Sequence, residues 1–198
     1  PPRLRAELAQ VAARLMAEEG MPGFAEAKAK ALDRLGVAGR PTLPSNQEVE
    51  AEVKRYQALF QADEQAHWLW AKRRAAVEVM RLLEPFTPLL VGSVLRGTAP
   101  AEAEVSLHVF ADPPERVATF LYDRGVAWNL DSWIGRFGGG RELELPVYRI
   151  RAGEEQVRLI VFPDEGLPEA PRSPIDGKPM QRAGYARVMD LVAEVEEP

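Results

Sequence analysis

Cysteine is absent from this chain of 198 residues, and histidine occurs only twice, as His67 and His108. The lack of cysteine excludes disulfide frameworks, thiolate zinc sites and cysteine nucleophiles. The scarcity of histidine excludes a metal centre built mainly from imidazole. No apolar run approaches the roughly 20 residues that span a bilayer, and no charged-then-apolar leader opens the chain. We therefore expect a soluble cytoplasmic protein with no membrane partner.

A surplus of charge of one sign is also lacking. Charged residues make up 28% of the chain and apolar residues 46%, and the formal net charge is −5, with no long run of like charge. This profile is that of an ordinary globular protein and does not favour a nucleic acid as partner. Trp68 and Trp70 lie beside basic residues, but on a stretch with helical periodicity, so we expect them to pack between helices.

The first 85 residues carry the 3.6-residue periodicity of helices. Apolar positions predict helices over about 4–20 and 24–36, each ended by a glycine. Ser45 followed by Glu48 is a capping box that opens a further helical region. This region is either one helix approaching 40 residues or two helices with a break near 61–65.

From Thr87 onward the apolar pattern changes to that of strands. A short buried strand, LLVGS, precedes EVSLHVF, in which Glu104, Ser106 and His108 share one face. A helix is expected after two prolines, then an antiparallel meander of three strands and a final helix; the three strands lie within 127–137, 141–151 and 155–162. The predicted fold is therefore α+β, with a helical region, 1–85, packed on a mixed-sheet domain, 86–198.

The stretch VGSVLRGTA, which contains Gly92 and Ser93, has a specific use in phosphoryl chemistry when a strand with alternating acids follows it. The glycine lets backbone approach a phosphate, and the serine hydroxyl and nearby N–H groups bind its oxygens. Two carboxylates at positions i and i+2 of the strand bind Mg²⁺. Here Glu104 is followed by Ser106, so the second acid is missing. The plainer alternatives are a strand-to-helix turn with Ser93 as its N-cap, and a solvated sheet face.

VGSVLRGTA followed by a strand ending in LHVFAD resembles the nucleotidyltransferase superfamily of DNA polymerase β type, in its minimal bacterial form. The resemblance implies that Gly92 and Ser93 form the phosphate-binding turn and that Glu104 is the first catalytic acid. It also implies that the second and third acids fall at Ser106 and near Arg158. At these two positions the chain has a hydroxyl and a cation.

This resemblance covers about residues 86 to 165. The closing stretch APRSPIDGKPMQRA is similar to a group of uncharacterised bacterial proteins with the same domain, some of them labelled UDP-N-acetylmuramate–alanine ligase. An ATP-dependent ligase of that kind needs a glycine-rich loop with Gly-Lys-Ser/Thr, and the sequence has none, so the label is not carried over. The loop at 168–180 either closes over a ligand or ties down the last helix.

Together these residues predict a nucleotidyltransferase-fold protein with a degenerate metal site, which is inactive or only binds a nucleotide or phosphate. The candidate phosphate-binding residues are Gly92, Ser93, Arg96 and Arg158. A cation at Arg158, where the family has an acid, suggests a cleft that holds phosphate without metal.

Two alternatives stay open. In the first, the chain is an active enzyme that transfers a nucleotidyl group from a nucleoside triphosphate to a protein or small-molecule hydroxyl. Glu104 would then be the catalytic acid and, with His108, a ligand of Mg²⁺, which is expected only if the chain is active. In the second, the chain is a non-enzymatic interaction module whose helical region binds a protein partner.

Overall fold

The computed structural model describes residues 2–163 and 169–195, which form seven α-helices and a five-stranded mixed sheet, an α+β fold as predicted. The helices are α1 (Pro2–Glu18), α2 (Phe24–Arg34), α3 (Asn46–Phe60), α4 (Ala62–Leu82), α5 (Gly92–Arg96), α6 (Glu115–Asp123) and α7 (Tyr185–Ala193). The strands are β1 (Leu89–Val91), β2 (Val105–Phe110), β3 (Asn129–Arg136), β4 (Glu142–Ala152) and β5 (Glu155–Phe162), and short 3-10 turns span Glu84–Phe86 and Gly138–Gly140. No described helix is long and apolar enough to cross a bilayer.

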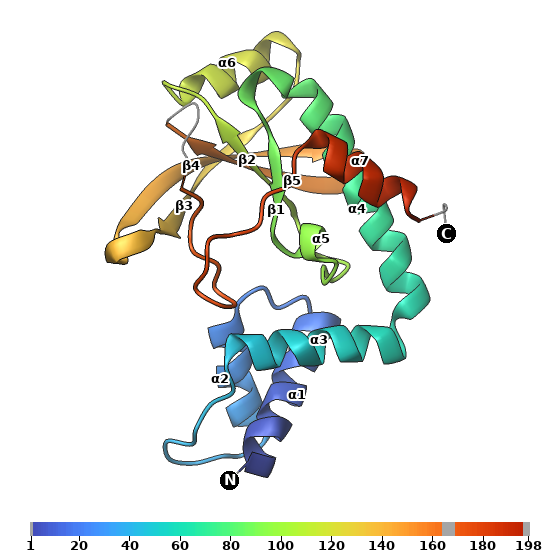
Figure 1. Ribbon diagram of the computed structural model, residues 1–198, viewed down its shortest axis with the longest axis vertical. Helices are drawn as coiled ribbons and strands as arrows, with labels where there is room; N and C mark the ends of the chain where they lie inside the picture. Colours follow the sequence, from blue (N-terminus) through green and yellow to red (C-terminus); the bar gives the residue numbers. More distant parts are fainter. Residues whose placement is uncertain (1, 164–168, 196–198) are drawn as a thin grey trace.

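Helices α1 and α2 lie where the periodicity predicts them. The long helical region after Ser45 is divided into two helices, α3 and α4, which was one of the two alternatives. At the start of α3, Ser45 Oγ accepts a hydrogen bond from the Glu48 N–H at 3.1 Å, and the Glu48 carboxylate accepts one from the Ser45 N–H at 2.6 Å. The break lies at Gln61, whose φ of −132° departs from helical geometry. The chain turns there, so that α4 leaves the group of α1, α2 and α3 and runs along the sheet (Figure 1).

Two of the three groups of buried apolar side chains in the described residues divide at this break. One group lies among α1, α2 and α3 and includes Leu8, Leu15 and Val49. The other joins α4 and α7 to one face of the sheet and includes Met80 and Leu107. Because α4 packs with the sheet, the packing boundary falls near residue 61, ahead of the domain division expected after residue 85.

The sheet has the strand order β1-β2-β5-β4-β3. The pair β2–β5 is parallel and the other pairs are antiparallel, which includes the predicted meander of β3, β4 and β5. The register sets Ser106 beside Arg158, and Arg158 beside Arg149. These three side chains therefore form a row across β2, β5 and β4, on the sheet face away from the main core.

Side chains of α3 and α4 fix the backbone that follows α5. Three of them donate to consecutive carbonyls: Gln65 Nε2 to Gly97 at 2.9 Å, Gln57 Nε2 to Thr98 at 2.9 Å, and Trp68 Nε1 to Ala99 at 2.8 Å. Since buried carbonyls need donors, this segment, 97–99, depends on the helical region for its hydrogen bonds. Trp68 was expected to pack between helices, and the structure gives it in addition a role that the sequence did not predict, as an anchor of this backbone segment.

The buried Arg73 completes this support from α4. Its Nε and Nη2 each donate at 3.0 Å, to the carbonyls of Val94 and Leu95 near the C-terminal end of α5. A cation at a helix C-terminus binds carbonyls that have no partner within the helix. The position of the turn at Gly92 and Ser93 is thus set from both sides, by β1 and by α4.

The C-terminal segment joins the sheet edge to the helical region, whereas the loop at 168–180 was expected either to close over a ligand or to tie down the last helix. Leu90 and Ala183 exchange backbone hydrogen bonds of 2.8 and 2.9 Å beside β1. Asn46 of α3 donates to the Pro174 carbonyl at 2.5 Å. Residue 168 of that loop lies outside the described residues, as do 164–167.

The hydrogen bond from Trp68 to Ala99 gives a test of this anchoring. Trp68→Phe keeps an aromatic ring in place but leaves the buried Ala99 carbonyl without its donor. We therefore expect the free energy of unfolding to fall by about 1–2 kcal/mol. Urea denaturation measures the change. Trp70→Phe is the matched control on the same helix, because the Trp70 ring contacts Arg74 and donates no hydrogen bond within the described residues. Equal losses in the two variants would contradict the anchoring role.

Candidate functional site

A cleft of about 880 Å³ separates the helical region from the open face of the sheet. It brings together five of the residues singled out in the sequence, namely Gly92, Ser93, Arg96, Glu104 and Arg158. Ser106 and Trp133 of the sheet also line it, and the far wall comes mainly from residues 20–25, which lead into α2, and from α3. The cleft is large enough for a nucleotide-sized ligand.

The turn at Gly92 opens into this cleft. Gly92 has φ of +79°, which side-chain-bearing residues rarely adopt, and no atom lies within 4 Å of where its Cβ would stand. Ser93 lies inside α5, because the N-cap position belongs to Val91 and no side chain caps the helix. The alternative in which Ser93 is an N-cap is therefore wrong, and Ser93 is among the residues that line the cleft.

Glu104 is bound by two arginines of the neighbouring strands. Arg149 donates from Nε to Glu104 Oε1 at 3.0 Å, and its Nη1 donates to the carboxylate of Asp131 on β3. These bonds lower the pKa of Asp131 and raise that of Arg149. A guanidinium thus bridges two carboxylates in a place where a metal-dependent site would need a divalent cation to do so.

Arg158 approaches the same carboxylate more loosely. Its Nε stands 3.5 Å from Glu104 Oε2, close enough for an ion pair, but this buried N–H has no hydrogen-bond acceptor among the described residues. Burial lowers the pKa of Arg158, while Glu104 acts to raise it. The side chain is 24% exposed, within the lining of the cleft. Arg158 therefore has donor capacity that its protein neighbours do not use.

The donors around Glu104 do not fit a magnesium site. Mg²⁺ takes near-octahedral oxygen ligands, usually carboxylates and phosphates. Both oxygens of Glu104 face guanidinium groups, and its neighbours across the sheet are the hydroxyl of Ser106 and the cation of Arg158. Within 2–163 and 169–195, no group of three or more histidine, aspartate or glutamate side chains could hold a metal ion.

His108, the other residue expected to bind metal, does not line the cleft. It is fully buried, and its Nδ1 accepts a hydrogen bond from Arg182 Nε at 3.1 Å. The ring lies 4.6 Å from that of Phe162, centre to centre, and the Arg182 guanidinium lies over the same phenylalanine at 5.1 Å. Burial, aided by the charges of Arg182 and Arg158, lowers the pKa of His108 to about 3.

Arg96 is oriented by a buried acid of α3. Its Nε donates to Glu50 Oε1 at 3.2 Å, and the same oxygen accepts from Thr98 Oγ1 at 3.0 Å. The Nη groups of Arg96 have no acceptor among the described residues. Arg96 therefore lines the cleft with most of its donors unused.

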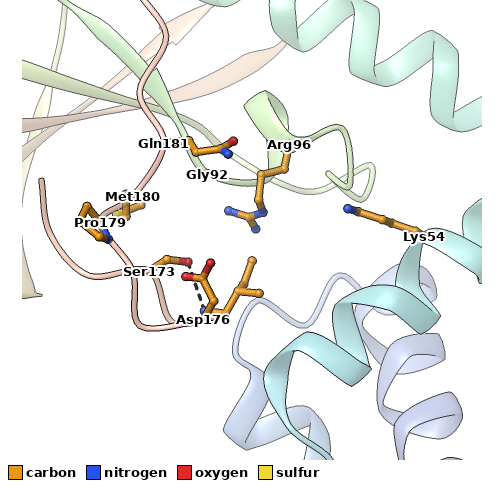
Figure 2. Close-up of a pocket in the computed structure, with 9 residues that line it drawn as sticks. Lys54, Gly92, Arg96, Ser173, Asp176, Pro179, Met180 and Gln181 are labelled. Carbon is orange, nitrogen blue, oxygen red and sulfur yellow. Dashed lines mark hydrogen bonds between the residues drawn. The ribbon is translucent and has the colours of Figure 1, made fainter.

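A smaller cavity of about 240 Å³ adjoins the cleft and shares Gly92, Arg96 and Met180 with it. Figure 2 shows Arg96 of α5 and Lys54 of α3 pointing into this space, with Asp176 and other residues of 173–181 along the opposite wall. The loop at 168–180 thus forms a wall of the site, in addition to its connecting role. Lys54 was missed in the sequence because its place on α3 looks like ordinary surface.

Trp133, Asp131 and Arg149 were also missed. The signal that could have found them is the register of the meander, which sets Asn129 opposite Arg149 and Asp131 two residue pairs further on, opposite Val147. That register was not predicted. No protein-family model, curated protein or solved structure matches the chain.

The buried His108 gives a pH prediction. Below its ordinary pKa of 6.5 the unfolded chain takes up a proton on this ring, whereas the folded chain does not until about pH 3. The contribution of His108 to the free energy of unfolding is therefore fully present above pH 6.5. It falls as the pH drops toward 3, by up to about 1.4 kcal/mol per pH unit.

Urea denaturation at several pH values between 7.5 and 4.5 measures this slope. His108→Gln removes the titrating ring and flattens the dependence, while His67→Gln, at an exposed position of α4, leaves it unchanged. The same slope in all three proteins would contradict the burial of a neutral His108. A proton-titration of the ring by NMR gives the same answer if His108→Gln fails to fold.

Proposed function

We propose that this chain is a nucleotidyltransferase-like protein that binds a nucleotide, or another phosphate-bearing ligand, without a metal ion. The observation that carries the proposal is the pairing of Glu104 with Arg149 and Arg158 on the wall of the cleft. In the superfamily that the sequence resembles, this place belongs to carboxylates that hold metal. Here two fixed cations supply the positive charge instead.

Guanidinium groups support binding better than they support transfer chemistry. An arginine matches the oxygens of a phosphate with paired N–H donors, but it has no open coordination position at which a hydroxyl could be activated. Glu104 and Asp131 together balance Arg149 and Arg158 in charge. Affinity would therefore depend on the unused donors of Arg158 and Arg96 rather than on a strong net positive potential.

The remaining walls suit the rest of a nucleotide. Trp133 offers a ring on which a base can stack, which is favourable for any base. Ser93 and Ser106 add hydroxyl groups to the lining of the same cleft. The active-transferase alternative has less support, because Glu104 and Asp131 would have to leave their arginines, and position 106 has a hydroxyl where the second acid is expected.

Protein binding by the helical region is a second candidate function, supported by a separate observation. A groove between α1 and α3, lined in part by Val11 and Tyr56, ends at two apolar side chains with large exposed fractions, Leu59 at 65% and Phe60 at 69%. Exposed apolar surface of this kind is typical of interaction sites. It does not compete with nucleotide binding, because the groove does not share lining residues with the cleft.

Arg158→Ala tests the main proposal. We expect the protein to bind at least one of ATP, GTP, CTP and UTP in EDTA, and the variant to bind it about tenfold more weakly or worse, since a charge-assisted contact is lost. Glu104 keeps its bond to Arg149, so the fold should survive. Isothermal titration calorimetry measures the affinities.

The control is Arg151→Ala on β4, an exposed arginine near Glu154 that does not line the cleft. The affinity of Arg151→Ala for the nucleotide should match that of the unchanged protein. Absence of binding by all four nucleotides, or equal affinities in Arg158→Ala and the unchanged protein, would contradict the proposal.

A further inference from the structure

The smaller cavity has the composition of a separate anion subsite. Its lining comes from three parts of the chain that are distant in sequence: Lys54 from α3, Gly92 and Arg96 from α5, and the loop residues that include Ser173, Asp176 and Gln181. Lys54 and Arg96 point into the same space in Figure 2. Lys54 makes no ion pair with any described residue.

Two cations that converge on one space repel each other, and an anion bound between them relieves this repulsion. Glu50 offsets part of the charge of Arg96, but it does so from the Nε side and is only 7% exposed. The Nη groups of Arg96 are left for the cavity. The Ser173 hydroxyl accepts from the Ile175 N–H at 3.2 Å, which leaves its own proton free to donate.

From this convergence we infer that the cavity between α3, α5 and the 173–181 loop binds a phosphoryl group, held by Lys54, Arg96 and Ser173. A volume of about 240 Å³ admits a phosphate or pyrophosphate but not a whole nucleotide. The fork of Arg96 and the point charge of Lys54 are two complementary ways to bind phosphate oxygens.

Asp176 sets a limit on this subsite. Its carboxylate also lines the cavity and accepts a hydrogen bond from the Lys178 N–H at 3.0 Å. A phosphoryl group nearby is repelled by this charge, so the acid weakens binding and restricts how close the ligand comes. A zwitterionic ligand with an ammonium group would be favoured by Asp176 instead. A substitution of Asp176 therefore distinguishes a phosphoryl ligand from a zwitterionic one.

The phosphoryl group has two sources that the cavity does not distinguish by itself. It is either the terminal phosphate of a nucleotide whose remainder lies in the large cleft, because both spaces share Arg96, or part of a separate phosphorylated compound. Only the first source rests on the proposed function.

The experiment titrates the full chain with pyrophosphate in EDTA and compares Lys54→Ala with Arg55→Ala. Both side chains are exposed on α3, but Arg55 pairs with Glu52 and lines the groove away from the cavity. We expect about tenfold weaker binding in Lys54→Ala and no change in Arg55→Ala. In Asp176→Asn, which keeps an oxygen for the Lys178 N–H, binding should become severalfold tighter.

Each outcome decides the inference. It fails if pyrophosphate does not bind, if the two α3 variants behave alike, or if Asp176→Asn weakens binding, which is the result a zwitterion site predicts. The inference is supported if the affinities of the three variants for pyrophosphate change as stated.

Titrations with ATP and AMP then identify the source. If Lys54→Ala lowers the affinity for ATP but not for AMP, the phosphoryl group is the terminal phosphate of a nucleotide. If it changes neither affinity, the phosphoryl group belongs to a separate compound. If Arg158→Ala loses nucleotide binding but Lys54→Ala does not change the affinity for pyrophosphate, this inference is wrong and the proposed function stands. If pyrophosphate binding depends on Lys54 but no nucleotide binds, the inference stands and the proposed function is wrong.

Discussion

The site depends on the attachment of one short segment, 97–99, to the helices α3 and α4. Three consecutive carbonyls of this segment receive side-chain donors from Gln57, Gln65 and Trp68, and Arg73 binds the carbonyls just before it. These bonds hold α5, and with it the glycine–serine turn, against the sheet edge. The helical region is therefore part of the site, since it fixes the turn and supplies the opposite wall of the cleft.

The charges on the sheet face decide which chemistry the cleft supports. A carboxylate that binds two guanidinium groups is a poor ligand for Mg²⁺, because each oxygen is already engaged and the nearby cations repel a further one. The same arginines are suitable partners for phosphate. With a hydroxyl at Ser106 and a cation at Arg158 beside a single strand carboxylate, this face favours ligand binding over metal-dependent transfer.

Much of the fold was predictable from the sequence because periodicity reports which face of an element is buried. The alternation in β2 correctly set Ser106 and His108 on one face, but it could not tell what covers that face. Arg182, about 70 residues later, encloses His108 while Glu104 stays in the cleft. Lys54 and Asp131 carry no local signal, since their roles arise from how α3 meets α5 and how β3 aligns with β4.

The most direct test of metal-free binding is calorimetric titration of the unchanged protein with ATP, GTP, CTP and UTP, each once in EDTA and once with excess Mg²⁺ or Mn²⁺. Fixed arginines in place of a metal predict binding in EDTA, with an affinity that the metal does not improve. Binding that appears only with the divalent ion would contradict this account and would mean that Glu104 leaves its arginines to hold a metal.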